Sequence, residues 1–322
     1  TQLSTTAEYE ISAISRNMNL QANCVARTDT AYKVKHVRQK LDGSYPTEET
    51  GELIEWDEKT GTTDASTEAV AKSYDGFSAN SFSQKTITGD AKTVVEIRYQ
   101  RLSYKLELAK GTGIDSVEGA QASVLYGKSV TIKANVSAGY TFANWTEGNT
   151  QVYGVDSAEK TFNMPAKNLT YTANATANTG TKYTVKHVRQ ALDGSYPDTG
   201  ELVETQELAG TTDTNTSASA KNSVSDPKYA GFLALPFNQV NITGDGKAVV
   251  TIKYERQSYT LSLETDDHIS ATSVNSSSYL SPVTLKFGAS VSIDATAAQG
   301  YDFKNWTDSG NFDTQVSDQK TF

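Results

Sequence analysis

The sequence has very little cysteine: Cys24 is the only one in 322 residues. A single cysteine can form neither an intrachain disulfide nor a cysteine-based zinc site, so both are excluded as sources of stability. Many extracellular proteins depend on disulfides, and an extracellular chain of this kind must be stabilised in another way. Long apolar stretches are also absent, because no run of about 18 apolar residues, the length that spans a bilayer, occurs in the sequence.

Positive charge is scarce as well. Lys and Arg number 29 against 38 Asp and Glu, which gives a formal net charge of −9 and a pI near 5.0. Such a chain gains little from displacing counterions, so neither nucleic acid nor an anionic membrane is an expected partner. Only 37% of the residues are hydrophobic, which suits several small β-rich modules with thin cores better than one large core.

Neither end of the sequence carries a recognisable signal. The opening TQLSTTAEYEIS has no basic region followed by an apolar stretch, and the closing QKTF has no turn or cap residue. We therefore expect the chain to be a piece of a longer protein.

Most of the sequence consists of two copies of one repeat. YKVKHVRQKLDGSYP at 32–46 returns as YTVKHVRQALDGSYP at 183–197, and GYTFANWT at 139–146 returns as GYDFKNWT at 300–307. The unit is about 155 residues, which is too long for one solenoid repeat and suits a pair of modules. We divide the chain into two kinds of segment, the A segments at 31–101 and 182–256 and the B segments at 102–181 and 257–322.

The A segments show the alternation of half-buried strands. Apolar Val95, Ile97 and Tyr99 share one face of a predicted strand, and residues 249–254 repeat the pattern. The stretch at 67–72, TEAVAK, is helix-like and has a weaker copy at 216–221.

Turn signals divide the A segments further. Asp42-Gly43 and its copy at 193–194 predict a tight hairpin, and Gly89-Asp90 and its copy at 244–245 predict a second one. Strand, strand, short helix, strand, strand is the order of a ubiquitin-like β-grasp module.

The B segments have no helical pattern. Short strands are expected over 104–108, 130–134, 139–145 and 170–173, separated by Gly, Asn and Asp turns. We therefore expect an all-β module in each B segment.

Both kinds of segment resemble repeats of Gram-positive surface proteins. The A segments are similar to mucin-binding-protein (MucBP-like) repeats in their Tyr-Thr-Val opening, their Asp-Gly turn and the Gly-Phe pairs at 76–77 and 231–232. The B segments are similar to internalin-type B repeats in the Gly-Tyr-x-Phe-x-x-Trp signature and in TFNMP at 161–165 followed by NLT at 168–170. The resemblance implies a mainly β, elongated chain of tandem small modules in an extracellular adhesin, usually anchored to the cell wall.

The function that this resemblance implies is that of a stalk or spacer that projects a distal binding domain. Short linkers such as NTGT at 178–181 leave little slack, so we expect a semi-rigid rod in which neighbouring repeats are the main partners. The alternative is that the repeats themselves bind host mucin, other glycans or proteins, and this alternative predicts exposed aromatic rings at Tyr45 and Tyr196. We expect no enzyme activity and no cofactor.

Residues 1–30 align with the end of the first B segment, so that Ile11 falls on Phe162 and Met18 on Leu169. We interpret 1–30 as the C-terminal strands of a preceding, missing B-repeat-like module, and 257–322 as a module that lacks its last strands. Unpaired strand edges readily template other chains. Head-to-tail self-association through residues 1–30 is one hypothesis, and a truncated chain with a locally folded or frayed tail is the other.

Residues that could carry chemistry are few, and each has a simpler structural interpretation. Lys-His-Val-Arg at 35–38 could be a basic patch, but strand alternation divides its charges between two faces. His36, His187 and His268 lack acids at ligand spacing and the positioned partner that a general base needs.

The remaining candidates are equally weak. Acids at 48–49 and 266–267 lack the spacing of a calcium loop, and GTG at 111–113 lacks the context of a phosphate-binding loop. Cys24, which aligns with Ala175, is expected to be buried, and Trp145 and Trp306 are expected in cores rather than as sugar platforms. We assign no catalytic, cofactor-binding or metal-binding residue, and ligand-binding residues stay unknown. A Lys–Asn isopeptide bond beside a buried acid would also suit such a stalk, and the sequence leaves this open.

Overall fold

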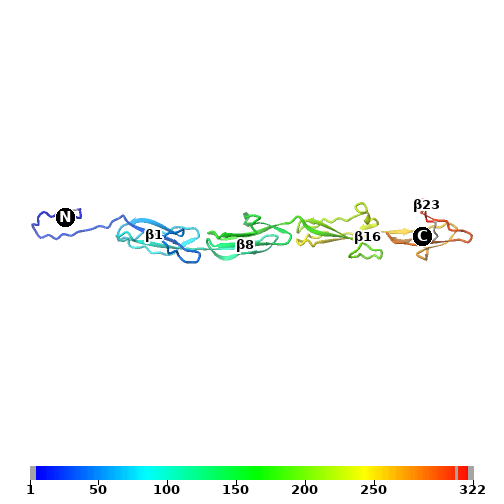
Figure 1. Ribbon diagram of the computed structural model, residues 1–322, viewed down its shortest axis with the longest axis horizontal. Helices are drawn as coiled ribbons and strands as arrows, with labels where there is room; N and C mark the ends of the chain where they lie inside the picture. Colours follow the sequence, from blue (N-terminus) through cyan, green and yellow to red (C-terminus); the bar gives the residue numbers. More distant parts are fainter. Residues whose placement is uncertain (1–4, 309–310, 318–322) are drawn as a thin grey trace. The chain divides into compact units, whose positions relative to one another are not determined.

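The computed structural model describes residues 5–308 and 311–317 of the chain. These residues form a nearly all-β protein of several small sheets (Figure 1). Among them the single helical element is a short 3₁₀ turn, η1 at Pro227–Tyr229, and none is a helix long and apolar enough to cross a bilayer. The chain divides into two compact units, one of residues 1–108, 119–132 and 160–171 and one of residues 109–118, 133–159 and 172–322.

The first A segment is a four-stranded mixed sheet. Its strands are β1 (Thr30–Arg38), β2 (Ile54–Gly61), β3 (Phe77–Ala79) and β4 (Val94–Arg101), in the spatial order β2-β1-β4-β3. Strand β1 runs antiparallel to β2 and parallel to β4. The face predicted from alternation is the core face, since Val95, Ile97 and Tyr99 are all buried.

The second A segment repeats this sheet. Its strands are β13 (Thr181–Arg189), β14 (Val203–Gly210), β15 (Phe232–Ala234) and β16 (Val249–Arg256), in the order β14-β13-β16-β15. The pairing is again antiparallel to β14 and parallel to β16. Buried apolar side chains from β13, from β16 and from the connections between strands fill its core: Tyr183, Val185, Ala218, Tyr229, Ile242, Ala248, Val250, Ile252 and Tyr254.

The helix expected over 67–72 is wrong, because this segment forms no regular secondary structure. Its backbone groups are bonded by side chains from distant parts of the chain rather than by each other. The amide of Ala69 donates to Gln84 Oε1 at 2.9 Å and its carbonyl accepts from Gln84 Nε2 at 2.8 Å. The hydroxyls of Tyr32 and Tyr99 accept two further amides from the same segment.

The copy at 216–221 forms no helix for the same reason, with Gln239 bonded to both backbone groups of Ala218. The crossover therefore differs from the helical one of a β-grasp module, and the MucBP-like resemblance of the A segments stays a prediction.

The two hairpins expected in the A segments also differ from the structure. Gly43 has the positive φ of 85° that was expected, but its turn lies within a long connection over residues 39–53 rather than joining β1 to β2 directly. Gly89-Asp90 forms a turn that leads into β4, yet the residues before it make only an isolated bridge, between Thr86 and Ser66. The pairing partner of β4 on that side is β3.

The first B segment is all β, as expected. Its strands are β5 (Ser103–Lys110), β6 (Ile114–Glu118), β7 (Gln121–Leu125), β8 (Ser129–Val136), β9 (Tyr140–Glu147), β10 (Thr150–Tyr153), β11 (Glu159–Asn163) and β12 (Leu169–Ala177). They form a five-stranded sheet in the order β10-β9-β12-β5-β7 and a three-stranded sheet in the order β11-β8-β6. Trp145 is fully buried, which confirms its predicted place in the core.

The second B segment has shorter strands in smaller sheets. They are β17 (Ser258–Leu261), β18 (Ile269–Val274), β19 (Ser277–Ser278), β20 (Val283–Lys286), β21 (Ile293–Ala297), β22 (Trp306–Asp308) and β23 (Asn311–Ser317). The sheets are β17-β20, β19-β18-β21 and β22-β23.

Residues 5–29 contain no strand, so the strands expected within 1–30 are not formed over the described part of that segment. A strand needs a paired neighbour along its length, whereas the backbone of this segment accepts one amide from elsewhere in the described chain, that of Thr63 at the carbonyl of Arg27. Cys24 is exposed here, which corrects the expectation that it is buried. The segment appears in Figure 1 as a trace without arrows that leads into β1.

Candidate functional site

A polar cluster of the first A segment surrounds His36, whose side chain is fully buried in β1. Its Nδ1 lies 2.6 Å from the hydroxyl of Tyr99, and its Nε2 lies 3.4 Å from Asp57 Oδ2. Because Nε2 faces a carboxylate, we assign the ring proton to Nε2, so Nδ1 accepts the proton of Tyr99. The ammonium of Lys72 closes the cluster, with bonds of 2.6 Å to Glu55 and 2.5 Å to Asp57.

The charges of this cluster set its pKa values. Burial, followed by the nearby ammonium of Lys72, lowers the pKa of His36, so the ring is neutral at neutral pH. Hydrogen bonds from Lys72 are the main cause that lowers the pKa of both Glu55 and Asp57, while the two carboxylates raise the pKa of Lys72. The cluster is thus a neutral histidine beside an ion pair.

The second A segment repeats the cluster with one change. His187 Nδ1 lies 2.7 Å from the hydroxyl of Tyr254, and Lys221 forms an ion pair with Glu204. Gln206 on β14 takes the place that Asp57 has on β2. Gln206 pairs with Val185 and Asp57 with Val34, and each of these valines lies two residues before the histidine. Burial lowers the pKa of His187 too.

Neither histidine is placed for catalysis. Both rings are fully buried, so a substrate cannot reach them, and each is held by a tyrosine that also accepts a backbone amide of the crossover. The cluster ties β1 or β13 to the crossover, and the interpretation of His36 and His187 as strand histidines agrees with this geometry.

A second kind of contact joins each A segment to the B segment that follows it. At the first of these joints the ring of Tyr126 lies directly against Gly76, where an added Cβ would meet the ring at 2.1 Å. The guanidinium of Arg101 stacks on Phe77, 4.7 Å from its ring centre, and donates to the carbonyl of Tyr126 at 2.7 Å. The amide of Leu102 donates to the carbonyl of Gly76 at 2.9 Å.

The joint between the second A and B segments is built in the same way. Phe287 replaces the tyrosine and lies against Gly231, where a Cβ would also meet the ring at 2.1 Å. Arg256 stacks on Phe232 at 4.6 Å and donates to the carbonyl of Phe287 at 2.6 Å. Both joints therefore use a glycine, an aromatic ring and an arginine at matching positions.

A different joint links the first B segment to the second A segment. Gly139 and Gly244 are so close that a Cβ on Gly139 would lie 2.4 Å from the Cα of Gly244. Thr212 donates through Oγ1 to the carbonyl of Gly139 at 2.8 Å and through its amide to the carbonyl of Asn178 at 3.0 Å. The hydroxyl of Tyr140 donates to the carboxylate of Asp213, and this bond is the main cause that raises the pKa of Tyr140.

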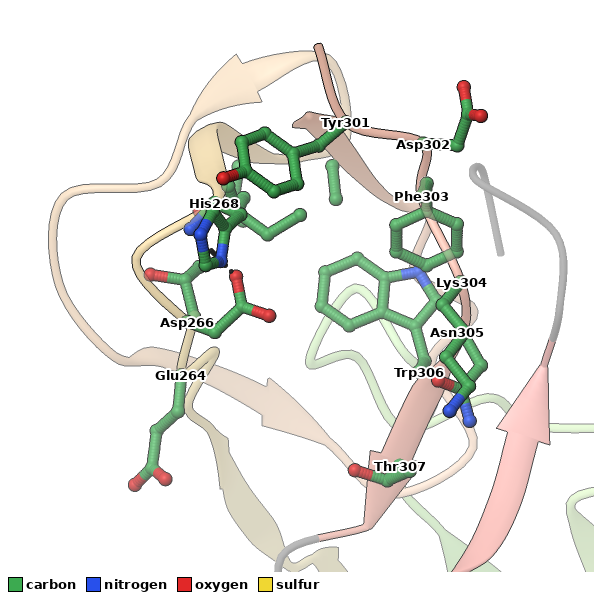
Figure 2. Close-up of a pocket in the computed structure, with 14 residues that line it drawn as sticks. Glu264, Asp266, His268, Tyr301, Asp302, Phe303, Lys304, Asn305, Trp306 and Thr307 are labelled. Atoms are coloured by element: carbon green, nitrogen blue, oxygen red, sulfur yellow. Dashed lines mark hydrogen bonds between the residues drawn. The ribbon is translucent and has the colours of Figure 1, made fainter. Parts of the chain in front are cut away.

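The second B segment contains an open pocket of about 370 Å³. Figure 2 shows Asp266, His268 and the ring of Tyr301 on one side of it and the rings of Phe303 and Trp306 on the other. The His268 and Tyr301 rings lie 4.0 Å apart, and the amide of His268 donates to Asp266 Oδ1 at 2.9 Å. The pocket brings together aromatic surface and carboxylates.

The two tyrosines predicted for a glycan-binding surface do not line this pocket. Tyr45 and Tyr196 are half-buried rather than exposed, which corrects the expectation made for a glycan-binding surface. Arg98 covers the face of the Tyr45 ring at 5.1 Å, and Lys253 covers that of Tyr196 at 5.0 Å. A sugar would have to displace these cations to stack on either ring.

The stretch Lys-His-Val-Arg does not form a basic surface. Lys35 is buried and bonds Glu49 Oε1 at 3.0 Å, so one acid of the pair at 48–49 serves as its partner. In the described residues, 5–308 and 311–317, no group of three or more His, Cys, Asp and Glu side chains is positioned to hold a metal ion. Residues 111–113 form the turn before β6. Trp306 is the first residue of β22 and is half-buried, whereas a place in the core was expected.

Comparison with known proteins supports the interpretation of the B segments. The family model described as "Divergent InlB B-repeat domain" matches residues 104–179 and 259–322. These matches confirm the predicted similarity of the B segments to internalin-type B repeats. A search of curated proteins found no matching sequence.

Two solved structures are similar to part of the chain. The Bacillus anthracis TIE protein shares 10% identity at a TM-score of 0.28, covering 71% of this chain and 50% of that one. Pilus adhesin SpaC from Lactobacillus rhamnosus GG shares 12% identity at a TM-score of 0.18, covering 71% of this chain and 44% of that one. The chain thus spans half or less of the length of these proteins, and likeness at this level does not define a shared fold.

Proposed function

We propose that this chain is a repeat region of a bacterial cell-surface adhesin that acts as a spacer and holds a distal binding domain away from the cell. The similarity of both B segments to B repeats supports a place in a surface protein, outside the cell and without enzyme activity. Anchoring to the cell wall would depend on other parts of such a protein.

The observation that carries the spacer function is the construction of the joints. A spacer transmits position only if neighbouring segments cannot swing freely about their linkers. At Gly76 and Gly231 an aromatic ring of the next segment occupies the space of the absent side chain, and at Gly139 two backbones touch. Each joint also carries hydrogen bonds from both neighbours, so bending it breaks packing and polar contacts together.

Small-angle X-ray scattering over a concentration series tests this proposal. Four segments of about 30 Å each in a row give a radius of gyration of about 35 Å, whereas a compact globule of this length gives about 20 Å. A value near the larger figure at low concentration is expected. A value near the smaller one would mean that the segments fold against one another, and the spacer function would have to be abandoned.

A second measurement separates a spacer from a binding module. The spacer function predicts that the purified chain does not bind a mucin-coated surface above the level of an unrelated acidic β-protein. The covered faces of Tyr45 and Tyr196 agree with that expectation. Saturable binding of the chain to mucin would replace the spacer by direct adhesion through the repeats.

A further inference from the structure

The first and last strands of each A segment lie side by side and run in the same direction. Strand β1 opens the first A segment and β4 closes it, and their parallel register runs from Lys33–Val94 to Arg38–Tyr99. Strands β13 and β16 repeat this pairing in the second A segment. In a parallel pair the chain enters at one end and leaves at the opposite end. A pull on the two ends of the segment therefore slides the strands along each other.

The first B segment has the same arrangement. Strand β5 opens it, β12 closes it, and the two are neighbours in the five-stranded sheet. Near the start of β5 the amide of Lys105 donates to Asn168 Oδ1 at 2.8 Å, directly before β12. Directly after β5 the amide of Gly111 donates to the carbonyl of Ala173 at 2.8 Å, further along β12. Both strands thus advance together, so this pair is parallel as well.

In all three segments the paired strands are interior strands of their sheets. The spatial orders are β2-β1-β4-β3, β10-β9-β12-β5-β7 and β14-β13-β16-β15, so each member of a pair has another strand on its outer side. Val34 on β1 and Ile97 on β4 are both 0% exposed, which places the middle of this pair against the core. Hydrogen bonds in such surroundings are stronger than bonds at an open, solvated edge.

Side chains add bonds across the pair in the first A segment. His36 on β1 accepts the hydroxyl proton of Tyr99 on β4, at 2.6 Å. Gln39, which directly follows β1, accepts the amide of Arg101 at its Oε1 and the Nε of Arg101 at its carbonyl, at 3.0 and 3.2 Å. These bonds hold the end of β4, where the chain leaves the segment, to the end of β1.

The second A segment keeps the same bonds. His187 on β13 is joined to the hydroxyl of Tyr254 on β16 at 2.7 Å. Gln190 accepts the amide and the Nε of Arg256, at 3.2 and 3.1 Å. Both A segments therefore have the same fastening between their first and last strands.

Little chain separates the paired strands of one segment from those of the next. Leu102 is the single residue between β4 and β5, residues 178–180 separate β12 from β13, and Gln257 is the single residue between β16 and β17. Tension along the chain therefore passes from the last strand of one segment to the first strand of the next, with no long loop to extend in between.

We propose that the pairs β1–β4, β5–β12 and β13–β16 are mechanical clamps that keep their segments folded when the chain is pulled along its length. The chain then bears tension. This goes beyond the spacer function, which needs resistance to bending and not to rupture. Sliding a parallel pair breaks its hydrogen bonds together, whereas peeling an edge strand breaks them one after another. Since forced unfolding is governed by the unfolding rate, the direction of pull sets the lifetime of the fold.

Single-molecule force spectroscopy on the whole chain tests the clamp by changing only the direction of pull. All variants carry Cys24→Ser, so that the handles attach at introduced cysteines. Asp29→Cys with Gln100→Cys pulls from the start of β1 and the end of β4, and slides the parallel pair. Asp29→Cys with Thr60→Cys peels β2, an antiparallel edge strand, because Thr60 pairs with Ala31 at the start of β1. The four substituted residues are exposed, so no change removes a buried side chain.

At the same constant force, the sliding geometry should give a folded lifetime about 100-fold longer than the peeling geometry. Each further hydrogen bond that must break in the same step slows rupture by up to about tenfold. Equal lifetimes in the two directions overturn the clamp. Urea midpoints of both variants are measured alongside, and a difference in lifetime no larger than the midpoints account for overturns it as well.

The second A segment repeats the test with its own residues. Gly180→Cys with Glu255→Cys slides β13 against β16, and Gly180→Cys with Ala209→Cys peels β14. All three positions are exposed, and a Cβ at Gly180 meets nothing within 4 Å. The same ratio of lifetimes is expected, and a ratio near one would overturn the clamp as a feature of the repeat. The scattering test is separate, because a compact chain with unequal lifetimes would end the spacer function and keep the clamp.

Discussion

Replacing Gly76 by alanine should open the first joint, since the ring of Tyr126 occupies the place of a side chain there. Two separate costs apply. Gly76 has a φ of 75°, a conformation that an alanine adopts at a cost of about 1–2 kcal/mol. The new Cβ would also lie 2.1 Å from Cγ of Tyr126, so the ring has to move, and overpacking of this kind costs about 1–3 kcal/mol.

A second glycine separates these two costs. Gly148 has a φ of 58°, but an added Cβ would meet nothing within 4 Å. Gly148→Ala should therefore carry the backbone cost alone, at about 1–2 kcal/mol, and should leave the joint intact.

Amide hydrogen exchange measures the joint directly. The amide of Leu102 donates to the carbonyl of Gly76, and the amide of Tyr126 donates to the carbonyl of Leu102, both at 2.9 Å. A combined loss of about 2–5 kcal/mol accelerates exchange at these two amides by about 30-fold or more, since every 1.4 kcal/mol is tenfold. Gly148→Ala should leave both rates unchanged. Unaltered protection of Leu102 in Gly76→Ala would refute the view that the glycine contact holds the joint.

Three further predictions concern the cores. Burial lowers the pKa of His36 and His187 from 6.5, so below about pH 6.5 the unfolded chain binds more protons than the folded one. The free energy of unfolding should therefore decrease as the pH is lowered below about 6.5, and urea midpoints at pH 7.5, 6 and 5 measure this decrease. Lys72→Met removes the cation beside two carboxylates, and because all three side chains are partly exposed it should cost only about 1 kcal/mol in urea unfolding. Trp145→Phe removes a fully buried indole whose Nε1 donates to the carbonyl of Ser157 at 2.9 Å, and it should lower the stability of the first B segment by about 2 kcal/mol by circular dichroism.

Each of these has a matched comparison. For the pH dependence, a midpoint that does not change between pH 7.5 and 5 would contradict the neutral, buried state of both histidines. Lys92→Met alters an exposed lysine and should be silent, so an equal loss in both lysine variants would point to a general charge effect. Trp56→Phe removes an indole that also bonds a carbonyl but is half-exposed, and a loss as large as that of Trp145→Phe would show that burial is not the cause.

The strands could be predicted from the sequence where one face alone is buried. Val95, Ile97 and Tyr99 alternate with polar residues, and this period fixes both the strand and its core face. The sequence repeat then predicted the equivalent strand in the second A segment, β16. The Gly-Phe pairs at 76–77 and 231–232 were visible as a recurring motif, but their role at the joints depends on rings far along the chain.

The crossovers could not be predicted in this way. Residues 67–72 have good helix formers, and the expected helix followed from them. Gln84, Tyr32 and Tyr99 take up the backbone groups of this stretch instead, and these partners are set by the tertiary fold rather than by local propensity. The covered rings of Tyr45 and Tyr196 have the same cause, since their cations come from the last strand of each A segment.

The joints bear on how such a chain changes length during evolution. At the two joints from an A to a B segment, the glycine lies in one segment and the aromatic ring in the next. A duplication of one whole unit therefore copies both halves of these contacts, wherever inside the unit the chain is cut. The new boundary is then complementary from the start, with no surface that selection must still adapt. The replacement of Tyr126 by Phe287 at the equivalent place shows how little of the interface has to be kept once the glycine and the arginine are in position. Gain or loss of pairs of segments should accordingly be better tolerated than insertion of a single A or B segment, which would bring mismatched faces together.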